Sequence, residues 1–462
     1  MTVLATAEPA IPAAVAVGAA YHAALRALSE RGRFGIRLGL GRTRALLREL
    51  GDPQLPIRGA LVAGTNGKGS VLALAGSALR AAGLRVGETP KPHLVTYRER
   101  IVIDGRPIQP DDFARLTREV LAAADRIDRR LGPPTEFELL TAMLFRRFAE
   151  VDVDVALVEV GLGGRLDATH AWDGGVAVVT NVGLDHTDRL GSTVEAIARE
   201  KAAIIERDDL AVTGATPPAL DVIRRRARRM GVPLRVVPPA PLVGLDRDGI
   251  DVELPRLGRT RVGLRGRHQA ANVATADALL DALHEAGIAN AGAGARRDGY
   301  ASVNWPGRLE LLARGGRQYL LDGAHNPDGA ATLAAALDDL WPDLATTPGP
   351  ARVALVTATM ADKDVDGIVG ALLAARVLRR ATIVTTAVDL ARALPAAALA
   401  DRWRAQATGQ RVLVTPTPEA ALDRAAATDA ELVVVAGSLY LVGAVRALLV
   451  DDPLLSDPPV TG

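Results

Sequence analysis

The chain has 462 residues, of which 48% are hydrophobic and 24% charged, a balance typical of a folded protein with a large core rather than a disordered or fibrous one. Its 55 basic and 54 acidic residues leave a formal net charge of +1, so no global field favours binding to nucleic acid or to an anionic membrane. Cysteine is absent, which excludes disulfides and zinc–thiolate sites and fits the cytoplasmic location that we expect.

Residues 1–20 are rich in alanine, lack the basic start of an export signal and contain no apolar run long enough to span a bilayer. We expect them to form a flexible N-terminal tail, and the aperiodic, Pro- and Asp-rich residues 451–462 to form another. The length predicts two domains between the tails. Because glycines and prolines gather in an aperiodic stretch at 292–307, we expect a linker there and domains at 21–299 and 300–450.

Apolar runs rich in β-branched residues are expected to form strands, and they occur at 59–63, 153–160, 176–182, 319–321, 353–356 and 432–436. Runs that are continuously apolar are typical of a parallel sheet covered on both faces. Helical patterns lie between them, as after Pro327, where Leu333, Leu337 and Leu340 fall on one face. The alternation predicts an α/β fold.

A glycine-rich segment follows the first predicted strand and opens a helix. It consists of Gly64, Thr65, Asn66, Gly67, Lys68, Gly69 and Ser70. In such a loop, backbone N–H groups can turn toward a polyphosphate, the helix N-terminus adds partial positive charge, and the lysine can meet the terminal phosphates. The spacing differs from the commonest phosphate loop because Gly69 separates the lysine from the hydroxyl. The segment predicts nucleotide binding, with a glycine-rich turn and a chance lysine as the alternative.

Two candidate metal ligands follow neighbouring predicted strands. Glu159 stands at the end of the run 153–160, and His186 lies just beyond the run 176–182. Ligands of open α/β sheets gather at the carboxyl ends of strands, so these side chains could form a Mg²⁺ site beside the phosphate loop. Each residue taken alone could also be a turn or capping group.

Lys201 falls within an apolar stripe of the next predicted helix, beside Ile197, Ala198 and Ala202. Its spacing favours a lysine whose stem packs while its ammonium reaches solvent. The alternative is a lysine held in a site, where a lowered pKa would make the amine reactive.

The order of these motifs resembles that of the dihydrofolate synthase / folylpolyglutamate synthase branch of the Mur ligase family. The matching segments are 64–70, 92–94, 98–100, 159–169, 183–187, 200–202, 266–272, 305–310, 322–327, 362–364 and 437–440. The resemblance implies a Mur-ligase-like central P-loop ATPase domain with a mostly parallel sheet, followed by a smaller Rossmann-like domain. It also implies a monomeric ligase that uses ATP and Mg²⁺ to join a folate-type carboxylate to glutamate through an acyl phosphate.

Roles for individual residues follow from the resemblance. Gly64 to Ser70 would cradle the phosphates of ATP, with further nucleotide contacts from Asn272, Arg308 and Asp322. The ligands of Mg²⁺ would be Glu159, His186 and Ser70. The substrate-binding residues would be Lys91, His93, His325 and Ser438. The catalytic residues would be Lys68, His186 and Lys201, the last carried as a carbamate.

Four positions depart from the folate branch. Arg37 and Gly41 stand where acidic residues are common, His170 replaces an asparagine, and Lys91 replaces a serine that contributes to the metal site. An ammonium has no lone pair to offer Mg²⁺. We expect Lys91 either to point away from the site or, as we favour, to face phosphate or the acceptor carboxylate beside a weakly held Mg²⁺.

Two other functions remain as alternatives. The altered acceptor side would suit an enzyme of the same chemistry that acts on a non-folate carboxylate. A nucleotide-binding regulatory protein without ligase activity is the second alternative, against which stands the presence of all four of Lys68, Glu159, His186 and Lys201. A Rossmann oxidoreductase is disfavoured because no G-x-G-x-x-G with a downstream acid follows a predicted strand.

Overall fold

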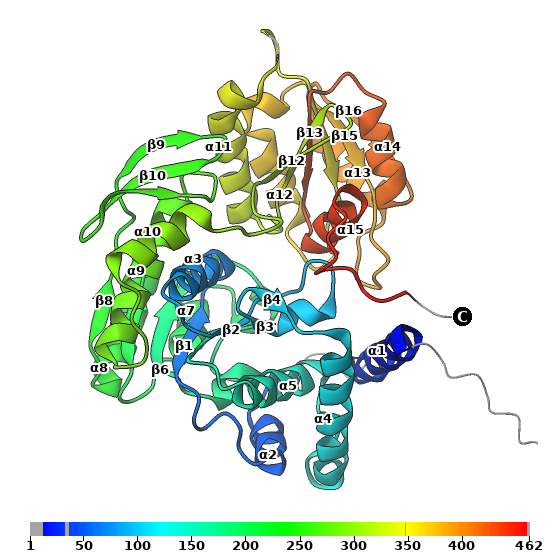
Figure 1. Ribbon diagram of the computed structural model, residues 1–462. Coiled ribbons are helices and arrows are strands. Elements are labelled where there is room, and N and C mark those ends of the chain that lie inside the picture. The colour runs from blue at the N-terminus through cyan, green and yellow to red at the C-terminus, as the bar shows by residue number, and fades with distance from the viewer. Residues whose placement is uncertain (1–12, 33–36, 347, 460–462) are drawn as a thin grey trace, which may run out of the picture.

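The computed structural model describes residues 13–32, 37–346 and 348–459, and the strands within these ranges form three sheets. Figure 1 shows the six-stranded C-terminal sheet with its helices as a unit above the eight-stranded N-terminal sheet, with strands β9 and β10 at one side. This architecture confirms the predicted α/β fold with two domains built around mostly parallel sheets. Within the described ranges, no helix is both long and apolar enough to cross a membrane.

The eight-stranded sheet has the order β4-β3-β2-β5-β1-β6-β7-β8. Its strands are β1 (Gly59–Ala63), β2 (Val86–Thr89), β3 (Val102–Ile103), β4 (Arg106–Pro107), β5 (Val155–Glu159), β6 (Gly175–Val179), β7 (Leu210–Thr213) and β8 (Leu234–Val236). All neighbours from β2 to β8 pair in parallel, and only the short strands β3 and β4 add antiparallel pairs at one edge. The phosphate loop after β1 and Glu159 at the end of β5 therefore meet at the same edge of the sheet.

Both faces of this sheet are buried, because alternate side chains of β1 enter different cores. Leu61 and Ala63 pack on one face against α1 (Ala13–Gly32), α2 (Gly41–Glu49), α4 (Pro110–Leu131), α5 (Glu136–Glu150), α7 (Val194–Ala202) and α8 (Ala219–Met230). Ala60 and Val62 pack on the other face against α3 (Lys68–Ala81), α9 (Gln269–Glu285) and α10 (Ala293–Ser302). An antiparallel sheet of β9 (Leu242–Asp246), β10 (Gly249–Leu254) and β11 (Gly258–Val262) extends this second core. Shorter helices are η1 (Tyr97–Arg100), η2 (Ala168–Ala171) and α6 (Thr187–Leu190).

The C-terminal sheet has the order β12-β13-β17-β14-β15-β16 and is parallel except for β12. Its strands are β12 (Glu310–Arg314), β13 (Arg317–Leu321), β14 (Val353–Thr357), β15 (Thr382–Thr385), β16 (Arg411–Val414) and β17 (Leu432–Ala436). One face is covered by α11 (Pro327–Leu344), α12 (Val365–Leu373), η3 (Arg376–Leu378) and α13 (Ala396–Gln406). The other face is covered by α14 (Pro418–Ala426) and α15 (Leu439–Leu449).

The predicted linker at 292–307 is wrong for most of its length, because residues 293–302 form α10. The glycines that suggested a linker include Gly299, where an added Cβ would lie 2.5 Å from both Cα and N of Ala78 in α3. At this position glycine permits two helix backbones to approach, rather than breaking a helix. The expected boundary at residue 300 therefore falls inside α10, and the chain passes to the C-terminal sheet after Ser302.

The predicted tails are also partly wrong. Residues 13–20 belong to α1, whereas residues 1–12 lie outside the described part of the chain. The segment 451–459 is irregular, yet its Leu454 and Ser456 carbonyls accept hydrogen bonds from Arg98. The segment has no periodic sequence pattern because its backbone is bound by side chains of the N-terminal domain, such as Arg98, and not by the hydrogen bonds of a helix or a sheet. Residues 460–462 lie outside the described part.

We predict that Gly299→Ala lowers the free energy of unfolding by about 1–3 kcal/mol, because the new methyl group would force α10 and α3 apart. Gly294→Ala in the same helix is the matched control, since nothing lies within 4 Å of its added Cβ. The control should be neutral or slightly stabilising. Urea unfolding of both variants measures the difference, and equal stabilities would contradict close packing at Gly299.

Candidate active site

A cleft of about 1140 Å³ lies between the two domains. It is lined by the phosphate loop and the strand ends of the N-terminal sheet on one side, and by loops after β13, β14 and β17 on the other. All the residues nominated from the sequence are described, and all but His93 line this cleft. The structure thus brings together groups that are up to several hundred residues apart in the chain.

The phosphate loop leaves β1 at Gly64 and enters α3 through Gly67, which has φ 81°. A Cβ at Gly67 would collide with Oδ1 of Asn272, so glycine is required there for both conformation and space. No side chain caps the N-terminus of α3, which leaves its first N–H groups available to an anion. Lys68 folds over the loop and donates from Nζ to the carbonyls of Gly64 and Thr65, at 3.1 Å each.

Glu159 ends β5 beside this loop with only 3% of its surface exposed. Its Oε1 lies 3.8 Å from Nζ of Lys68, and its Oε2 accepts a 2.9 Å hydrogen bond from the backbone N–H of Lys91. Burial raises the pKa of Glu159, and the neighbouring Lys68 and Lys91 oppose that rise. The carboxylate is therefore placed to balance cations at the end of the sheet.

Lys91 turns toward Glu159 and not toward solvent. Its Nζ donates to the backbone carbonyl of Glu159 at 2.7 Å and lies 4.5 Å from the centroid of the Phe137 ring. The expected alternative in which this side chain points away from the site is therefore wrong, because the carbonyl and the ring provide a cation site beside β5. Burial lowers the pKa of Lys91 to about 8.

Lys201 is also buried, with 5% of its surface exposed, and its Nζ donates to the carbonyl of Gly64 at 2.8 Å. The interpretation from spacing, a lysine whose ammonium reaches solvent, is wrong. The apolar stripe that contains Lys201 faces the core, and the ammonium is held by the phosphate loop rather than extended into solvent. Burial, with the nearby charge of Lys68, lowers the pKa of Lys201 to about 7.

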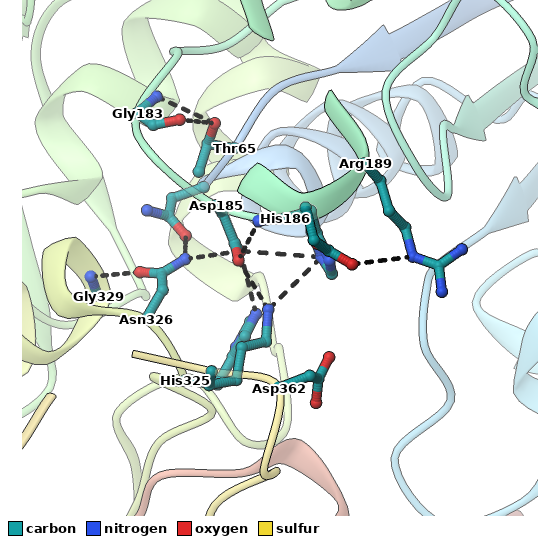
Figure 2. Close-up of polar contacts among 12 residues, drawn as sticks. Thr65, Gly183, Asp185, His186, Arg189, His325, Asn326, Gly329 and Asp362 are labelled. Atoms are coloured by element: carbon teal, nitrogen blue, oxygen red, sulfur yellow. Dashed lines mark hydrogen bonds and ion pairs between the residues drawn. The ribbon is translucent and has the colours of Figure 1, made fainter. Parts of the chain in front are cut away.

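A cluster of polar groups from both domains converges on Asp185, as Figure 2 shows. Nζ of Lys363 donates to Oδ1 of Asp185 at 2.7 Å and lies 3.5 Å from Nε2 of His186. Nδ2 of Asn326 donates both to Oδ2 of Asp185, at 3.1 Å, and to Oδ1 of Asn66 in the phosphate loop, at 3.2 Å. Burial alone would raise the pKa of Asp185, but His186 and Lys363 hold it well below its usual range.

Three of these residues were not nominated from the sequence: Asp185, Asn326 and Lys363. The signal was present, since each lies in a segment that matches the family pattern. Their partners, however, come from the other domain, and spacing along the chain does not show pairs that form across a cleft.

On the C-terminal side, Asp322 accepts backbone hydrogen bonds from Leu309 and Ala324, at 2.9 Å each. Burial raises the pKa of Asp322 despite the nearby Arg308. His325 contacts the carbonyl of Gly323 through Nδ1 at 2.7 Å, and burial lowers its pKa to about 4, so it is neutral at pH 7.

Ser438 and Asn272 lie at the ends of helices that face the cleft. Ser438 caps α15, and its Oγ accepts from the N–H of Tyr440 at 3.2 Å. Nδ2 of Asn272 in α9 donates to Gln269 at 2.8 Å, which directs its oxygen toward Gly67.

His93 does not line the cleft. Its ring packs on Tyr97, with centroids 4.3 Å apart, and its Nδ1 accepts from Nε of Arg100 at 3.1 Å. Burial lowers the pKa of His93 to about 3, so it remains neutral at neutral pH. Arg100 lines the cleft and His93 does not, although the two side chains are joined by this hydrogen bond.

Two of the three groups nominated for Mg²⁺ fit an ion that shares its ligands with a nucleotide, whereas Nε2 of the third, His186, lies 3.5 Å from the ammonium of Lys363. Glu159 and Ser70 supply the oxygen atoms that Mg²⁺ prefers, and both border the phosphate loop. In the described part of the chain, no group of three or more His, Asp or Glu side chains could hold a metal ion by itself. Phosphate oxygens would have to complete the coordination.

Comparison with known proteins agrees with this geometry. Residues 62–238 match the Mur ligase middle domain, and residues 307–439 match the glutamate ligase domain of Mur ligases. The chain is 36% identical over 463 residues to dihydrofolate synthase/folylpolyglutamate synthase of Mycobacterium tuberculosis, with 90% of each chain covered. It is 36% identical over 360 residues to the protein of the same name from Bacillus subtilis, covering 76% of this chain and 82% of that one.

The chain belongs to the dihydrofolate synthase/folylpolyglutamate synthase family. Among solved structures, Mycobacterium tuberculosis folylpolyglutamate synthase complexed with ADP matches with a TM-score of 0.84 and 33% identity, covering 94% of this chain and 99% of that one. Escherichia coli FolC in complex with DHPP and ADP matches with a TM-score of 0.75 and 31% identity, covering 92% and 97%. Membership confirms the resemblance seen in the motifs and identifies the chain as an ATP-dependent amino acid ligase.

We predict a stability difference between the wild-type enzyme and Lys91→Met that depends on pH. The pKa of Lys91 is about 8 in the folded chain and near 10.5 when unperturbed, so between these values the unfolded state binds more protons. Wild-type stability relative to the variant should therefore rise from about pH 8 to 10.5 and be constant below pH 8. Urea unfolding of both proteins across this pH range measures the difference in their free energies of unfolding. A difference that is constant at all pH values would contradict a buried Lys91.

Proposed function

We propose that this enzyme joins L-glutamate to a folate-type carboxylate, either dihydropteroate or a folylglutamate, and converts ATP to ADP and phosphate. The main observation is that one cleft holds a phosphate loop from the N-terminal domain opposite His325 and Ser438 from the C-terminal domain. The relatives named above carry the same activity in their names, and the FolC neighbour was solved with DHPP and ADP. A nucleotide site facing a second substrate site is what an acyl-phosphate ligase requires.

In the proposed reaction, a carboxylate oxygen of the acceptor attacks the γ-phosphorus of ATP in line, and ADP leaves. The amino group of glutamate then attacks the acyl carbon, phosphate leaves, and the amine gives up a proton. The N-terminus of α3 and Lys68 would hold the phosphates and stabilise their charge during transfer. Mg²⁺ held by Glu159, Ser70 and His186 with the nucleotide would supply further positive charge.

The C-terminal domain would supply the amino-acid side of the site. Asn272, Arg308 and Asp322 would hold the nucleotide where the two domains meet, while His325 and Ser438 would face the incoming glutamate. The contacts of Lys363 and Asn326 with Asp185 join the domains at this point. Such closure would keep water from the acyl phosphate.

We also propose that Lys201 carries a carbamate during catalysis. Its pKa of about 7 leaves a substantial neutral fraction of the amine, which is the form that adds to CO₂. The product would replace a buried cation by an anion beneath the phosphate loop, where Lys68 lies near enough to pair with it.

Three cations, Arg37, Lys91 and Arg100, are part of the cleft lining, together with acidic residues such as Glu136 and Asp167. We propose that the ammonium of Lys91 faces the acceptor carboxylate. A non-folate carboxylate is the second candidate acceptor, and the departures at Arg37 and Lys91 favour it. A monomeric state and a cytoplasmic location stay predictions.

We predict that ADP forms only when acceptor, glutamate and Mg²⁺ are all present, because an acyl phosphate is productive only when an amine captures it. The measurement is ADP release over a panel of carboxylates that includes dihydropteroate and reduced folates. Lys68→Ala should lower turnover by roughly a hundredfold or more without unfolding the chain. Equal ATP turnover without any acceptor would exclude the ligase reaction, and activity limited to other carboxylates would favour the second candidate acceptor.

We predict that Lys201→Ala loses most activity and regains part of it in acetate, whose carboxylate can occupy the space of the missing carbamate. The matched control is Lys201→Ala in chloride at the same ionic strength. Activity in both media is measured with saturating ATP. A fully active alanine variant, or one that acetate and chloride affect alike, would remove the carbamate from the mechanism.

A further inference from the structure

The loop between β2 and β3 carries Lys91 and Arg100 into the cleft, but its middle belongs to the core of the other domain. Leu94 is buried among side chains of the C-terminal sheet and α15, including Val442. A Cβ at Gly443 of α15 would collide with the carbonyl of Leu94, so the loop backbone runs directly against that helix. The loop is N-terminal by sequence and is packed by the C-terminal domain.

The same loop is held from a second direction by the segment 451–459, which follows α15. Arg98 is 3% exposed and donates from Nη2 to the carbonyls of Leu454, at 2.9 Å, and Ser456, at 2.8 Å. Oδ1 of Asp457 accepts from Oγ1 of Thr96 at 2.5 Å and lies 3.5 Å from Nε of Arg98. The segment thus supplies both acceptors of Nη2 and the only carboxylate paired with this buried guanidinium among the described residues, while Nη1 donates to the carbonyl of Ile108.

The segment also reaches α1. The hydroxyl of Tyr21 donates to Oδ1 of Asp457 at 2.8 Å, and Nε2 of His22 lies 2.7 Å from the carbonyl of Pro458. At its other end, Oδ2 of Asp452 lies 3.5 Å from Nη1 of Arg446 in α15. The segment is thus anchored on the C-terminal domain and spans to the N-terminal one.

A tight turn makes the segment a defined shape. The carbonyl of Asp452 accepts from the N–H groups of Leu455 and Ser456, at 3.0 Å each, and Oδ1 of Asp452 accepts from the N–H of Leu454 at 3.0 Å. The Leu454 and Ser456 carbonyls are therefore presented to Arg98 in fixed directions.

We propose that the C-terminal domain, through α15 and the segment 451–459, sets the shape of the loop 90–100 and thereby the acceptor side of the cleft. Arg98 in the loop and Asp457 in the segment are positioning residues in this arrangement, since they pair with each other and do not line the cleft. The inference rests on the proposed function in one respect, namely that Lys91 and Arg100 face the acceptor. No residue of the segment 451–459 lines the cleft, so the segment affects acceptor affinity through the loop 90–100 and leaves ATP affinity unchanged.

The test compares the full chain with a variant that ends at Asp451, and Asp457→Ala with Asp457→Asn. The truncation should raise KM for the acceptor about tenfold or more, as the loss of charge-assisted hydrogen bonds to Arg98 predicts, while KM for ATP stays within about twofold. Asp457→Ala should raise KM for the acceptor by a smaller factor than the truncation does. Asp457→Asn keeps an oxygen that accepts from Thr96 and Tyr21 and should restore most of the affinity. Asp451→Ala, an exposed carboxylate on the same segment, is the matched control.

Amide hydrogen exchange gives a readout that does not depend on the substrate. In the truncated chain, exchange at residues 94–100 should become faster, while residues 64–70 keep their wild-type rates. Unchanged exchange at 94–100, or a rise in both KM values by the same factor, would show that the segment only stabilises the fold and would overturn the inference. If the wild-type enzyme used no folate-type acceptor, faster exchange confined to 94–100 would still support control of the loop, and the proposed function alone would fail.

Discussion

The site depends on an excess of buried positive charge at one edge of the N-terminal sheet. The carbonyl of Gly64 accepts hydrogen bonds from both Lys68 and Lys201, and the carbonyl of the neighbouring strand end, Glu159, accepts one from Lys91. Two buried carboxylates, those of Glu159 and Asp167, lie near enough to oppose part of this charge. Burying unpaired charge is costly, and the lowered pKa values of Lys91 and Lys201 show that cost. A polyphosphate would offset this charge, so the edge of the sheet is electrostatically complementary to an anionic ligand.

The parallel sheet explains why these groups meet. Parallel strands end at a common edge, so the loops after β1, β5 and β6 present a phosphate loop, a carboxylate and the Asp185–His186 pair to one space. The C-terminal sheet repeats the arrangement, and the loops after β13, β14 and β17 present His325, Lys363 and Ser438 to the same space. Two sheets that face each other by their carboxyl edges therefore line one cleft with residues of both domains.

Much of this was predictable, and the failures have physical causes. The strands at 59–63, 153–160 and 432–436 are continuous apolar runs, and the phosphate loop and Glu159 follow two of them directly, so local pattern was enough. Lys201 was misjudged because spacing shows which face of a helix a residue occupies but not what covers that face. The helix α10 was missed because Gly299 serves packing against a helix more than 200 residues away. The hydrogen bond between Asp185 and Lys363 could not be predicted from local pattern because it joins residues 178 positions apart.

The contact of Gly299 with Ala78 has a mechanical consequence. The helix α3, which follows the phosphate loop, packs closely against α10 at this glycine, and α10 is the last element before the chain crosses to the C-terminal sheet. No compressible side chain lies at that contact to absorb a displacement. The position of α10, and with it the point at which the chain leaves the N-terminal domain, is therefore fixed relative to α3.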